Sequence, residues 1–163
     1  MVARSISRDQ VLEWLSEVPD PEIPVLTIAD LGILRDVTVD DDVVVALTPT
    51  YTGCPATEVI EQSVIDTLHR HGIESVSIDR VLSPPWTTDW ISEDGRDKLR
   101  EYGIAPPEQG ASKRALLQGE RSVACPRCQS LETEIVSEFG STACKAAYRC
   151  RACLEPFEYF KCI

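Results

Sequence analysis

Four cysteines near the C-terminus form the most informative chemical pattern in this chain. They make two Cys-x-x-Cys pairs, Cys125 with Cys128 and Cys150 with Cys153. Two residues between the thiols allow both sulfurs of a tight turn to face one ion, so two such pairs supply the four thiolates of a tetrahedral metal site. The 21 residues between the pairs leave room for a short hairpin. The spacing is typical of a zinc ribbon, and a rubredoxin-like iron site has the same ligands.

Two more cysteines of the tail exceed what a four-thiolate site needs. Cys144 lies where the hairpin is expected to turn, and Cys162 is next to the last residue. Either could replace one of the four ligands, because hairpin geometry is not readable from the sequence. The simpler interpretations are a buried filler for Cys144 and an unused thiol for Cys162. His69 and His71 flank the end of a predicted helix, and we assign them no metal role.

Cys54 is the one cysteine of the front part of the chain, in Thr-Pro-Thr-Tyr-Thr-Gly-Cys-Pro from Thr48. The pattern places it where a strand ends and a helix begins. A thiolate there is stabilised by exposed backbone N–H groups and the helix dipole, which makes it a better nucleophile and metal ligand. A small buried residue that caps the helix explains the pattern equally well. No His or second Cys lies close in sequence, so a catalytic Cys–His pair is not supported.

A proline-fixed loop carries two carboxylates, Asp20 and Glu22, within Pro-Asp-Pro-Glu-Ile-Pro from Pro19. Such a pair could bind a metal transiently or act as acid and base. Asp beside Pro more often closes a turn, and the residues alone favour that interpretation.

Two tryptophans, Trp86 and Trp90, bracket a short segment after Pro84-Pro85. Tryptophans on an exposed loop can form a docking surface for a partner. Packing of the last helix onto the sheet is the commoner use, and we expect it here.

Hydrophobic periodicity and turn residues predict the elements that must position these groups. A capping box of Ser7 and Gln10 begins the first helix, and Gly72 ends the second, whose apolar stripe includes Val59. The expected helices span about 7–18, 55–71 and 92–101, and the expected strands span 33–39, 43–48 and 75–82. The first two strands form a hairpin through the aspartates of 40–42. This order predicts an α+β domain over 1–105.

A segment rich in Pro, Gly and charge, 106–122, is the expected linker to a small module at 123–163. Strands are expected at 131–137, 146–150 and 157–161, which makes the module all-β. At 41 residues it is near the size below which a hydrophobic core seldom suffices. A structural metal supplies the missing stability, so loss of the metal should unfold the module.

Charge and composition limit the partners of the 163-residue chain. Residues 1–110 carry 8 Lys and Arg against 21 Asp and Glu, a net −13, while 111–163 carry 8 against 6, a net +2. So acidic a front part repels phosphate backbones, which argues against nucleic acid and leaves a solvated surface or a basic protein partner. The sequence has no apolar run long enough to span a membrane and no signal-peptide core. Seven cysteines then indicate metal ligands or reactive thiols in a reducing cytoplasm.

Longer motifs resemble two known families. The segments Asp20-Pro21-Glu22, Asp30-Leu31-Gly32 and Cys54-Pro55-Ala56 resemble the SufT-like domain of iron–sulfur assembly factors. Over nearly the whole chain, the sequence resembles the PaaD family of the phenylacetyl-CoA ring-epoxidase system. The motifs that carry the second resemblance are Pro-Asp-Pro-Glu-Ile-Pro-Val-Leu-Thr-Ile from Pro19, Thr-Pro-Thr-Tyr-Thr-Gly-Cys-Pro-Ala-Thr-Glu from Thr48, Trp-Thr-Thr-Asp-Trp from Trp86, Glu-Phe-Gly-Ser-Thr-Ala-Cys-Lys from Glu138, Glu-Pro-Phe from Glu155 and Phe-Lys-Cys-Ile from Phe160.

The resemblance implies a place in aerobic phenylacetate degradation, with the other epoxidase subunits as partners. It implies an accessory protein, with no catalytic activity of its own, that helps insert or repair a metal centre. Carried over by position, Cys54 is the functional thiol, with Asp20 and Glu22 beside it. The cysteines at 125, 128, 150 and 153 then hold zinc or iron, and iron or an iron–sulfur cluster binds transiently at Cys54.

Three functional hypotheses follow. In the first, the chain is an accessory maturation protein that contacts iron in transit, in a homodimer or a site shared with the client. In the second, the four tail thiolates bind iron and relay electrons to an oxygenase. Colour separates these two, because zinc is d¹⁰ and spectroscopically silent while a ferric tetrathiolate absorbs visible light. The third, a nucleic-acid-binding ribbon, is disfavoured by the charge.

Overall fold

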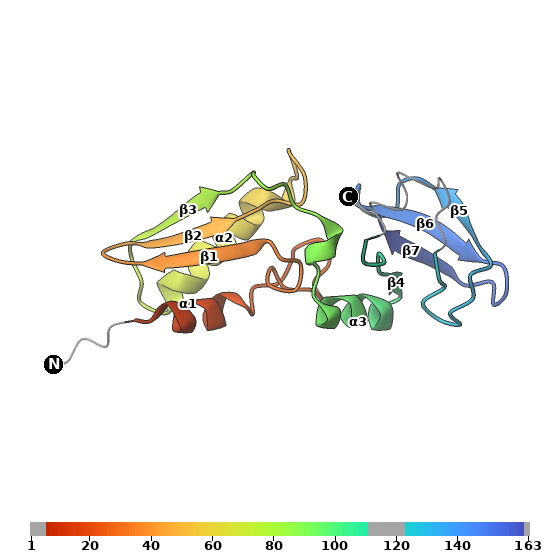
Figure 1. Ribbon diagram of the computed structural model, residues 1–163, viewed down its shortest axis with the longest axis horizontal. Coiled ribbons are helices and arrows are strands. Elements are labelled where there is room, and N and C mark those ends of the chain that lie inside the picture. Colours follow the sequence, from red (N-terminus) through yellow and green to blue (C-terminus); the bar gives the residue numbers. More distant parts are fainter. Residues whose placement is uncertain (1–5, 111–122, 162–163) are drawn as a thin grey trace. The chain divides into compact units, whose positions relative to one another are not determined.

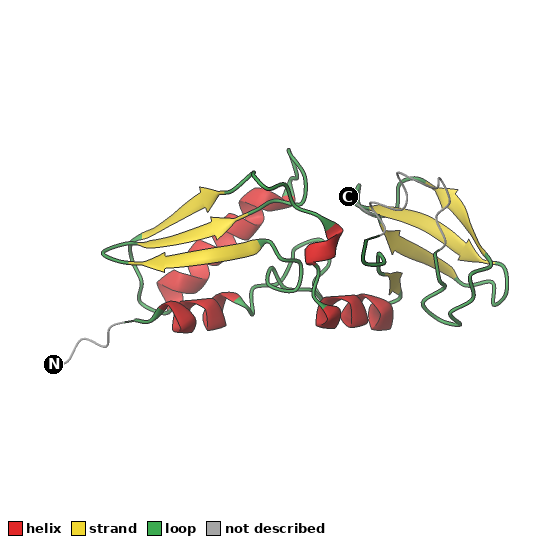
Figure 2. Ribbon diagram, viewed as in Figure 1, coloured by secondary structure: helices red, strands yellow, loops and turns green. Residues whose placement is uncertain are grey.

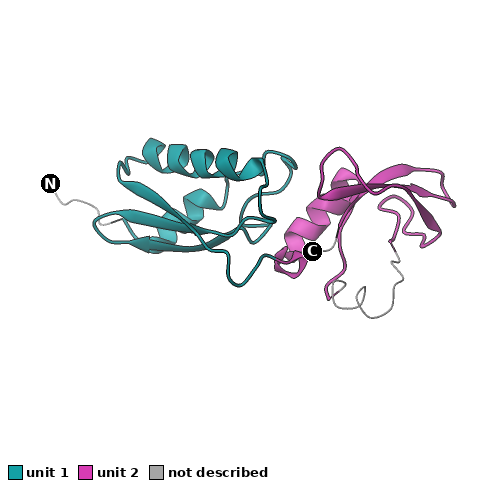
Figure 3. Cartoon of the chain, turned by 90° about the horizontal axis from the view of Figure 1, so that it is seen from above, with its two compact units in different colours: residues 1–86 teal, residues 87–163 magenta. Residues whose placement is uncertain are grey.

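The structure of the chain is a computed structural model that describes residues 6–110 and 123–161. The chain forms two compact units, Met1–Trp86 and Thr87–Ile163 (Figure 3). The first combines helices with a three-stranded sheet, and the second combines one longer helix with a four-stranded sheet (Figures 1 and 2). The predicted α+β class is therefore confirmed.

The first unit has the predicted α-β-β-α-β order. Its elements are α1 (Arg8–Leu15), β1 (Leu34–Val39), β2 (Val43–Leu47), α2 (Ala56–Arg70) and β3 (Val76–Arg80). Strands β1 and β2 form the predicted antiparallel hairpin, and β3 pairs in parallel with β2, so the sheet order is β1-β2-β3. The parallel pairing requires a crossover, which α2 provides. Helix α2 lies along one face of the sheet (Figure 3).

Local signals fix the ends of both helices in this unit. The Ser7 hydroxyl accepts a hydrogen bond from the backbone N–H of Gln10 at 3.2 Å, which confirms the predicted N-cap of α1. Helix α2 has Pro55 as its N-cap, and Gly72 follows its C-cap with φ = 84°. A left-handed conformation there favours glycine, which confirms the predicted stop signal.

One prediction about α2 was wrong. Val59 was expected on the buried stripe, but it is 51% exposed. The core-facing positions are Ala56, Ile60, Val64 and Leu68, four residues apart, with Thr67 beside them. Val59 lies one position before Ile60 and is turned about 100° away from it around the axis, which carries its side chain toward solvent.

Three loops of the first unit meet at one end of its sheet. The N–H of Thr48, just after β2, donates to the carbonyl of Ile33, just before β1, at 2.9 Å. The N–H of Val81, just after β3, donates to the carbonyl of Leu47 at 2.9 Å. The segments 19–33, 48–55 and 81–86 are thereby gathered, because each enters or leaves the sheet at this end. Trp86 then ties the third segment to the first, since its indole N–H donates to the carbonyl of Leu31 at 2.7 Å.

The second unit carries the cysteine-rich ribbon. Its elements are a short 3₁₀ helix η1 (Thr88–Trp90), α3 (Glu93–Tyr102), β4 (Ile104–Ala105), β5 (Thr133–Ser137), β6 (Lys145–Cys150) and β7 (Pro156–Phe160). The three predicted tail strands are present, and β5–β6 and β6–β7 pair antiparallel in the order β4-β7-β6-β5. Two of the predicted metal ligands, Cys125 and Cys150, are buried in its core with Tyr148, Phe157 and Tyr159.

The two units divide after Trp86, ahead of the boundary expected after residue 105. Strand β4 pairs in parallel with β7, with Ile104 opposite Glu158. The buried Arg96 of α3 donates to the carbonyl of Pro107 and, at 2.8 Å, to that of Thr88. Helix α3 and the start of the expected linker therefore pack with the ribbon, while 111–122 lie outside the described residues.

Candidate metal centre and lone thiol

The four predicted ligands come together in the second unit. One ligand atom from each of Cys125, Cys128, Cys150 and Cys153 lies within 4.8 Å of the other three. Between the pairs, the sulfurs of Cys125 and Cys153 are 3.7 Å apart, and those of Cys128 and Cys150 are 3.6 Å apart. Sulfurs about 2.3 Å from one ion at tetrahedral angles lie about 3.8 Å apart, so the donor set fits a zinc or iron tetrathiolate. A disulfide bond, at about 2.05 Å, does not fit.

Two turns with the same backbone design position these sulfurs. We call 125–130 the first knuckle and 150–155 the second. In each, the N–H of the first cysteine donates to the carbonyl of the residue five places later, at 3.0 Å and 2.9 Å respectively. One place before that acceptor, Gln129 and Leu154 have φ of 61° and 63°. Both are non-glycine residues in a sparsely populated region, which the surrounding contacts must hold in place.

Hydrogen bonds set the charge of the second knuckle. The backbone N–H of Cys153 donates to the Cys150 sulfur at 3.5 Å and, with smaller contributions from other donors, lowers the pKa of Cys150 to about 7. For Cys153, the N–H of Glu155 lowers the pKa, but burial and the neighbouring thiols outweigh it and raise the pKa to about 12. Four crowded sulfurs cannot all ionise unless a cation shares their charge. A metal ion bound by the four sulfurs would supply that charge.

Metal affinity should therefore rise with pH. Between about pH 7 and 12 the metal must displace at least the Cys153 proton, and below 7 the Cys150 proton as well. Acidification adds proton competitors, so affinity should fall by at least about tenfold per pH unit on going from 8.5 to 7.5. Competition with a chelator of known affinity at pH 6.5, 7.5 and 8.5 measures this slope. An affinity that does not change with pH would contradict the protonation scheme.

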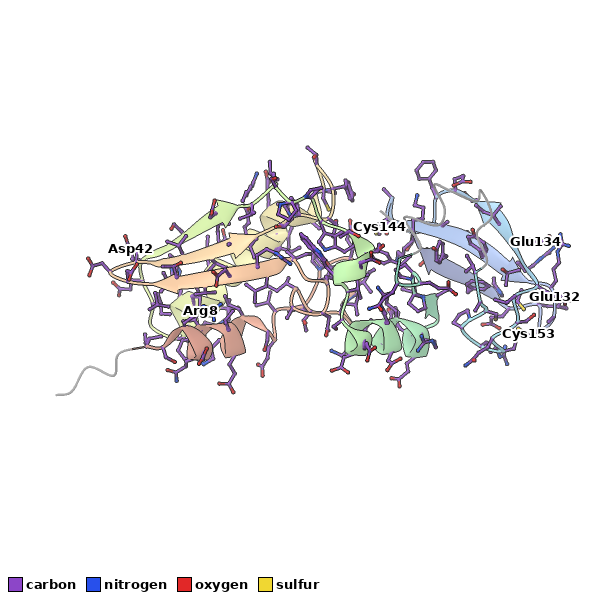
Figure 4. All side chains as sticks on the ribbon, viewed as in Figure 1. Arg8, Asp42, Glu132, Glu134, Cys144 and Cys153 are labelled. Atoms are coloured by element: carbon purple, nitrogen blue, oxygen red, sulfur yellow. The ribbon has the colours of Figure 1, made fainter. Side chains whose placement is uncertain are left out.

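The fifth described cysteine of the tail is not part of this group. Cys144 directly precedes β6, whereas the predicted ligand Cys150 is the last residue of β6, so the two cysteines lie at opposite ends of the strand. Figure 4 shows Cys144 well away from another predicted ligand, Cys153. The Cys144 side chain is buried, with its sulfur 3.0 Å from the hydroxyl of Thr142. These contacts match the filler interpretation. Cys162 lies outside the described residues.

Cys54 lies at the end of the first unit's sheet where the segments 19–33, 48–55 and 81–86 meet. It directly precedes Pro55, the N-cap of α2, and its carbonyl accepts from the N–H of Thr57 at 3.1 Å. The preceding Gly53 has φ = 82°, which turns the chain into the helix. Cys54 is half-buried, so it is not sealed in the core, and it is not the cap because the N-cap is Pro55. This position is the helix-start placement that the sequence predicts.

Asp20 and Glu22, the acidic residues predicted to act beside Cys54, lie in the first of these three segments, 19–33. Asp20 is 7% exposed, and its Oδ1 accepts from the N–H groups of Glu22 and Ile23 at 2.9 Å and 2.7 Å. This is the turn-closing arrangement expected of Asp next to proline. Glu22 is partly exposed in the same turn. The structure thus gives Asp20 a role in holding the loop.

Sequence reasoning missed several charged groups that organise the ribbon. Lys145 is 4% exposed and pairs with Glu158 at 3.1 Å, and Glu158 also accepts from the Ser141 N–H at 2.5 Å. A pair formed by Arg127 and Glu155 connects the two knuckles. The sequence does show an arginine, Arg127, inside the first Cys-x-x-Cys pair. It could not identify Glu155 as its partner, because the two residues are 28 positions apart.

Known proteins resemble each part of the chain. Residues 8–79 match a family model described as an iron–sulfur cluster assembly protein, and 109–161 match one described as the PaaD zinc beta ribbon domain. Solved structures share the first fold. A domain of unknown function, DUF59, from Bacillus anthracis has a TM-score of 0.53 at 28% identity, with 56% of this chain and 90% of that one covered. A conserved hypothetical protein from Thermotoga maritima has a TM-score of 0.51 at 28% identity, with 60% and 98% covered.

Curated relatives cover just over half of the chain or nearly all of it. A Fe-S protein maturation auxiliary factor of Porphyromonas gingivalis is 35% identical over 57% of this chain and 90% of its own. A putative 1,2-phenylacetyl-CoA epoxidase subunit of Escherichia coli is 55% identical over 98% of this chain and 97% of its own. With its ribbon cysteines assembled as a metal site and its front sheet built as in the assembly proteins, the chain belongs to the PaaD family.

Proposed function

We propose that this chain is an accessory protein of a phenylacetyl-CoA epoxidase system, and that it helps to assemble or repair an iron or iron–sulfur centre in a partner subunit. The observation that carries the proposal is the difference in how much of the chain each relative covers. An Fe-S protein maturation auxiliary factor aligns with 57% of this chain, and the iron–sulfur cluster assembly model matches the front residues 8–79, whereas the epoxidase subunit of Escherichia coli aligns with 98% of the chain. One chain thus joins a domain used in maturation to a ribbon found with one oxygenase system. We place it in the cytoplasm with that system; no helix in the described part could cross a membrane.

In this proposal, Cys54 contacts the iron that passes through. Cys54 is only half-buried and directly precedes a helix, and its thiol gives up its proton when it binds iron as a thiolate. Glu22 in the neighbouring loop offers a carboxylate, and Asp20 keeps that loop in shape. One thiolate holds iron weakly enough to release it but cannot retain a cluster alone. A second copy of the chain or the client subunit must therefore complete the site.

The ribbon has a different role in this proposal. Two of its four sulfurs are buried, and all four are needed by one ion, so we assign them to a resident metal that shapes the module. Zinc suits that role because it has no redox chemistry. An electron-relay function needs iron at the same place, and metal analysis of the purified protein distinguishes the two metals.

Loss of the chain should lower the iron content of the epoxidase. In a strain that lacks it, the purified epoxidase complex should contain less iron per active site and turn over correspondingly less phenylacetyl-CoA. Iron analysis of the complex, with and without the gene restored on a plasmid, measures the effect. A complex that is fully loaded and active in the deletion strain would rule the maturation role out.

A further inference from the structure

An ion pair joins the two metal-binding knuckles. The Nη1 of Arg127 lies 2.5 Å from the Oε2 of Glu155. Arg127 stands inside the first knuckle, between Cys125 and Cys128, whereas Glu155 ends the second. Both side chains remain partly exposed, at 68% and 37%. The pair therefore bridges two loops that supply two ligands each.

The backbone of Glu155 is itself part of the second knuckle. Its carbonyl accepts from the N–H of Cys150 at 2.9 Å, and the preceding Leu154 is held in the left-handed conformation. The side chain of Glu155 consequently projects from a fixed point. When it binds Arg127, it ties the first knuckle to that same point. Another arginine cluster, Arg149 and Arg151 on Glu134, joins the start of β5 to the end of β6 and the second knuckle instead.

Separation of the two knuckles opens the metal site. Each knuckle contributes two thiolates, so moving one pair of sulfurs away from the other removes half of the ion's ligands at once. We propose that the Arg127–Glu155 ion pair is a latch between the knuckles, and that it slows the escape of the bound metal. A single exposed ion pair contributes little to folding, but this one joins the two ligand loops directly and opposes their separation. The inference is independent of the proposed maturation role.

For Glu155, charge alone predicts the opposite effect on metal binding to the one that the latch predicts. A divalent ion with four thiolates carries a net charge of −2. The cation of Arg127 stabilises that charge, and the anion of Glu155 opposes it. If only charge mattered, Glu155→Gln would hold the metal more tightly. A latch predicts the reverse, because Gln cannot form the ion pair.

Transfer of zinc from the full-length, zinc-loaded chain to a chromogenic chelator tests the latch. We expect Arg127→Gln and Glu155→Gln each to release zinc about three- to tenfold faster than the unaltered chain, in line with the modest strength of exposed pairs and the larger effects of groups that support metal ligands. The double variant should be no faster than the faster single variant, since both changes break the same contact. Arg149→Gln is the matched control: Arg149 is 57% exposed and is bound to Glu134, but it joins no knuckle to the other.

Two results would overturn the latch. One is release from Glu155→Gln at an unchanged or lower rate, and the other is release from Arg149→Gln as fast as from Arg127→Gln. The exchanged pair, Arg127→Glu with Glu155→Arg, guards against a general loss of folding. It restores the bridge with the charges reversed, so slow release should return; fast release from a zinc-loaded exchanged variant would also overturn the proposal.

Discussion

Stripping the metal from the tail should unfold the ribbon and leave the front sheet folded. Two ligands, Cys125 and Cys150, are fully buried in the ribbon core, so the metal lies where a larger domain would place more apolar side chains. Metal binding contributes about 10–16 kcal/mol to folding in small zinc domains, which exceeds what so few aromatic side chains supply. The change is therefore expected to be all-or-none for β5, β6 and β7.

Amide hydrogen exchange with and without a strong chelator measures this effect for each strand. Amides of β6 should lose their protection when the metal is removed, while those of β2, in the other compact unit, should keep theirs. Cys150→Ser should behave like the stripped protein, and Cys144→Ser, which changes a buried cysteine outside the cluster, should not. Protected β6 amides in metal-free protein would show that the ribbon core is self-sufficient.

Replacing Cys54 by Ser should abolish client activation without disturbing the fold. The substitution keeps the size of the side chain and removes the soft, ionisable sulfur that the proposed chemistry needs. Cys54 is half-buried and lies outside the metal cluster, so neither the core nor the ribbon depends on it. Epoxidase turnover and iron content, measured in a deletion strain that carries the variant, should match those of the empty strain.

Thr52→Ser is a suitable control for this experiment. Thr52 is exposed in the same loop, so its replacement alters the loop surface while leaving the thiol in place. It should complement fully. Full epoxidase activity with Cys54→Ser would exclude the thiol from the mechanism, and the family relationship and the metal-dependent ribbon would be unaffected by that outcome.

Short-range patterns predicted much of the architecture. The Cys-x-x-Cys spacing identified four ligands whose sulfurs lie within 4.8 Å, because a turn of that length leaves few other geometries. Ser7 and Gly72 marked helix ends through local hydrogen bonding and φ preference, which act within a few residues. Cys54 was placed correctly for the same reason: a Gly before it and a Pro after it fix the start of α2.

Features that depend on distant residues were not predictable. Strand β4 has only two residues, Ile104 and Ala105, too few for any periodicity, and the prolines after it are typical of a linker. Its pairing with β7 became visible only in the fold. The Arg127–Glu155 bridge and the burial of Lys145 against Glu158 likewise depend on how the hairpin brings separate turns together.

Strand β4 also determines which fragment of the chain can be moved to another protein as an intact ribbon. The ribbon family match begins at residue 109 and so leaves out β4, which pairs with β7. A fragment cut at that match would leave the outer edge of β7 with open backbone donors and acceptors, which invites intermolecular strand pairing. Grafting or shuffling of this module between proteins should therefore carry the chain from Thr87 onward, where the compact unit starts.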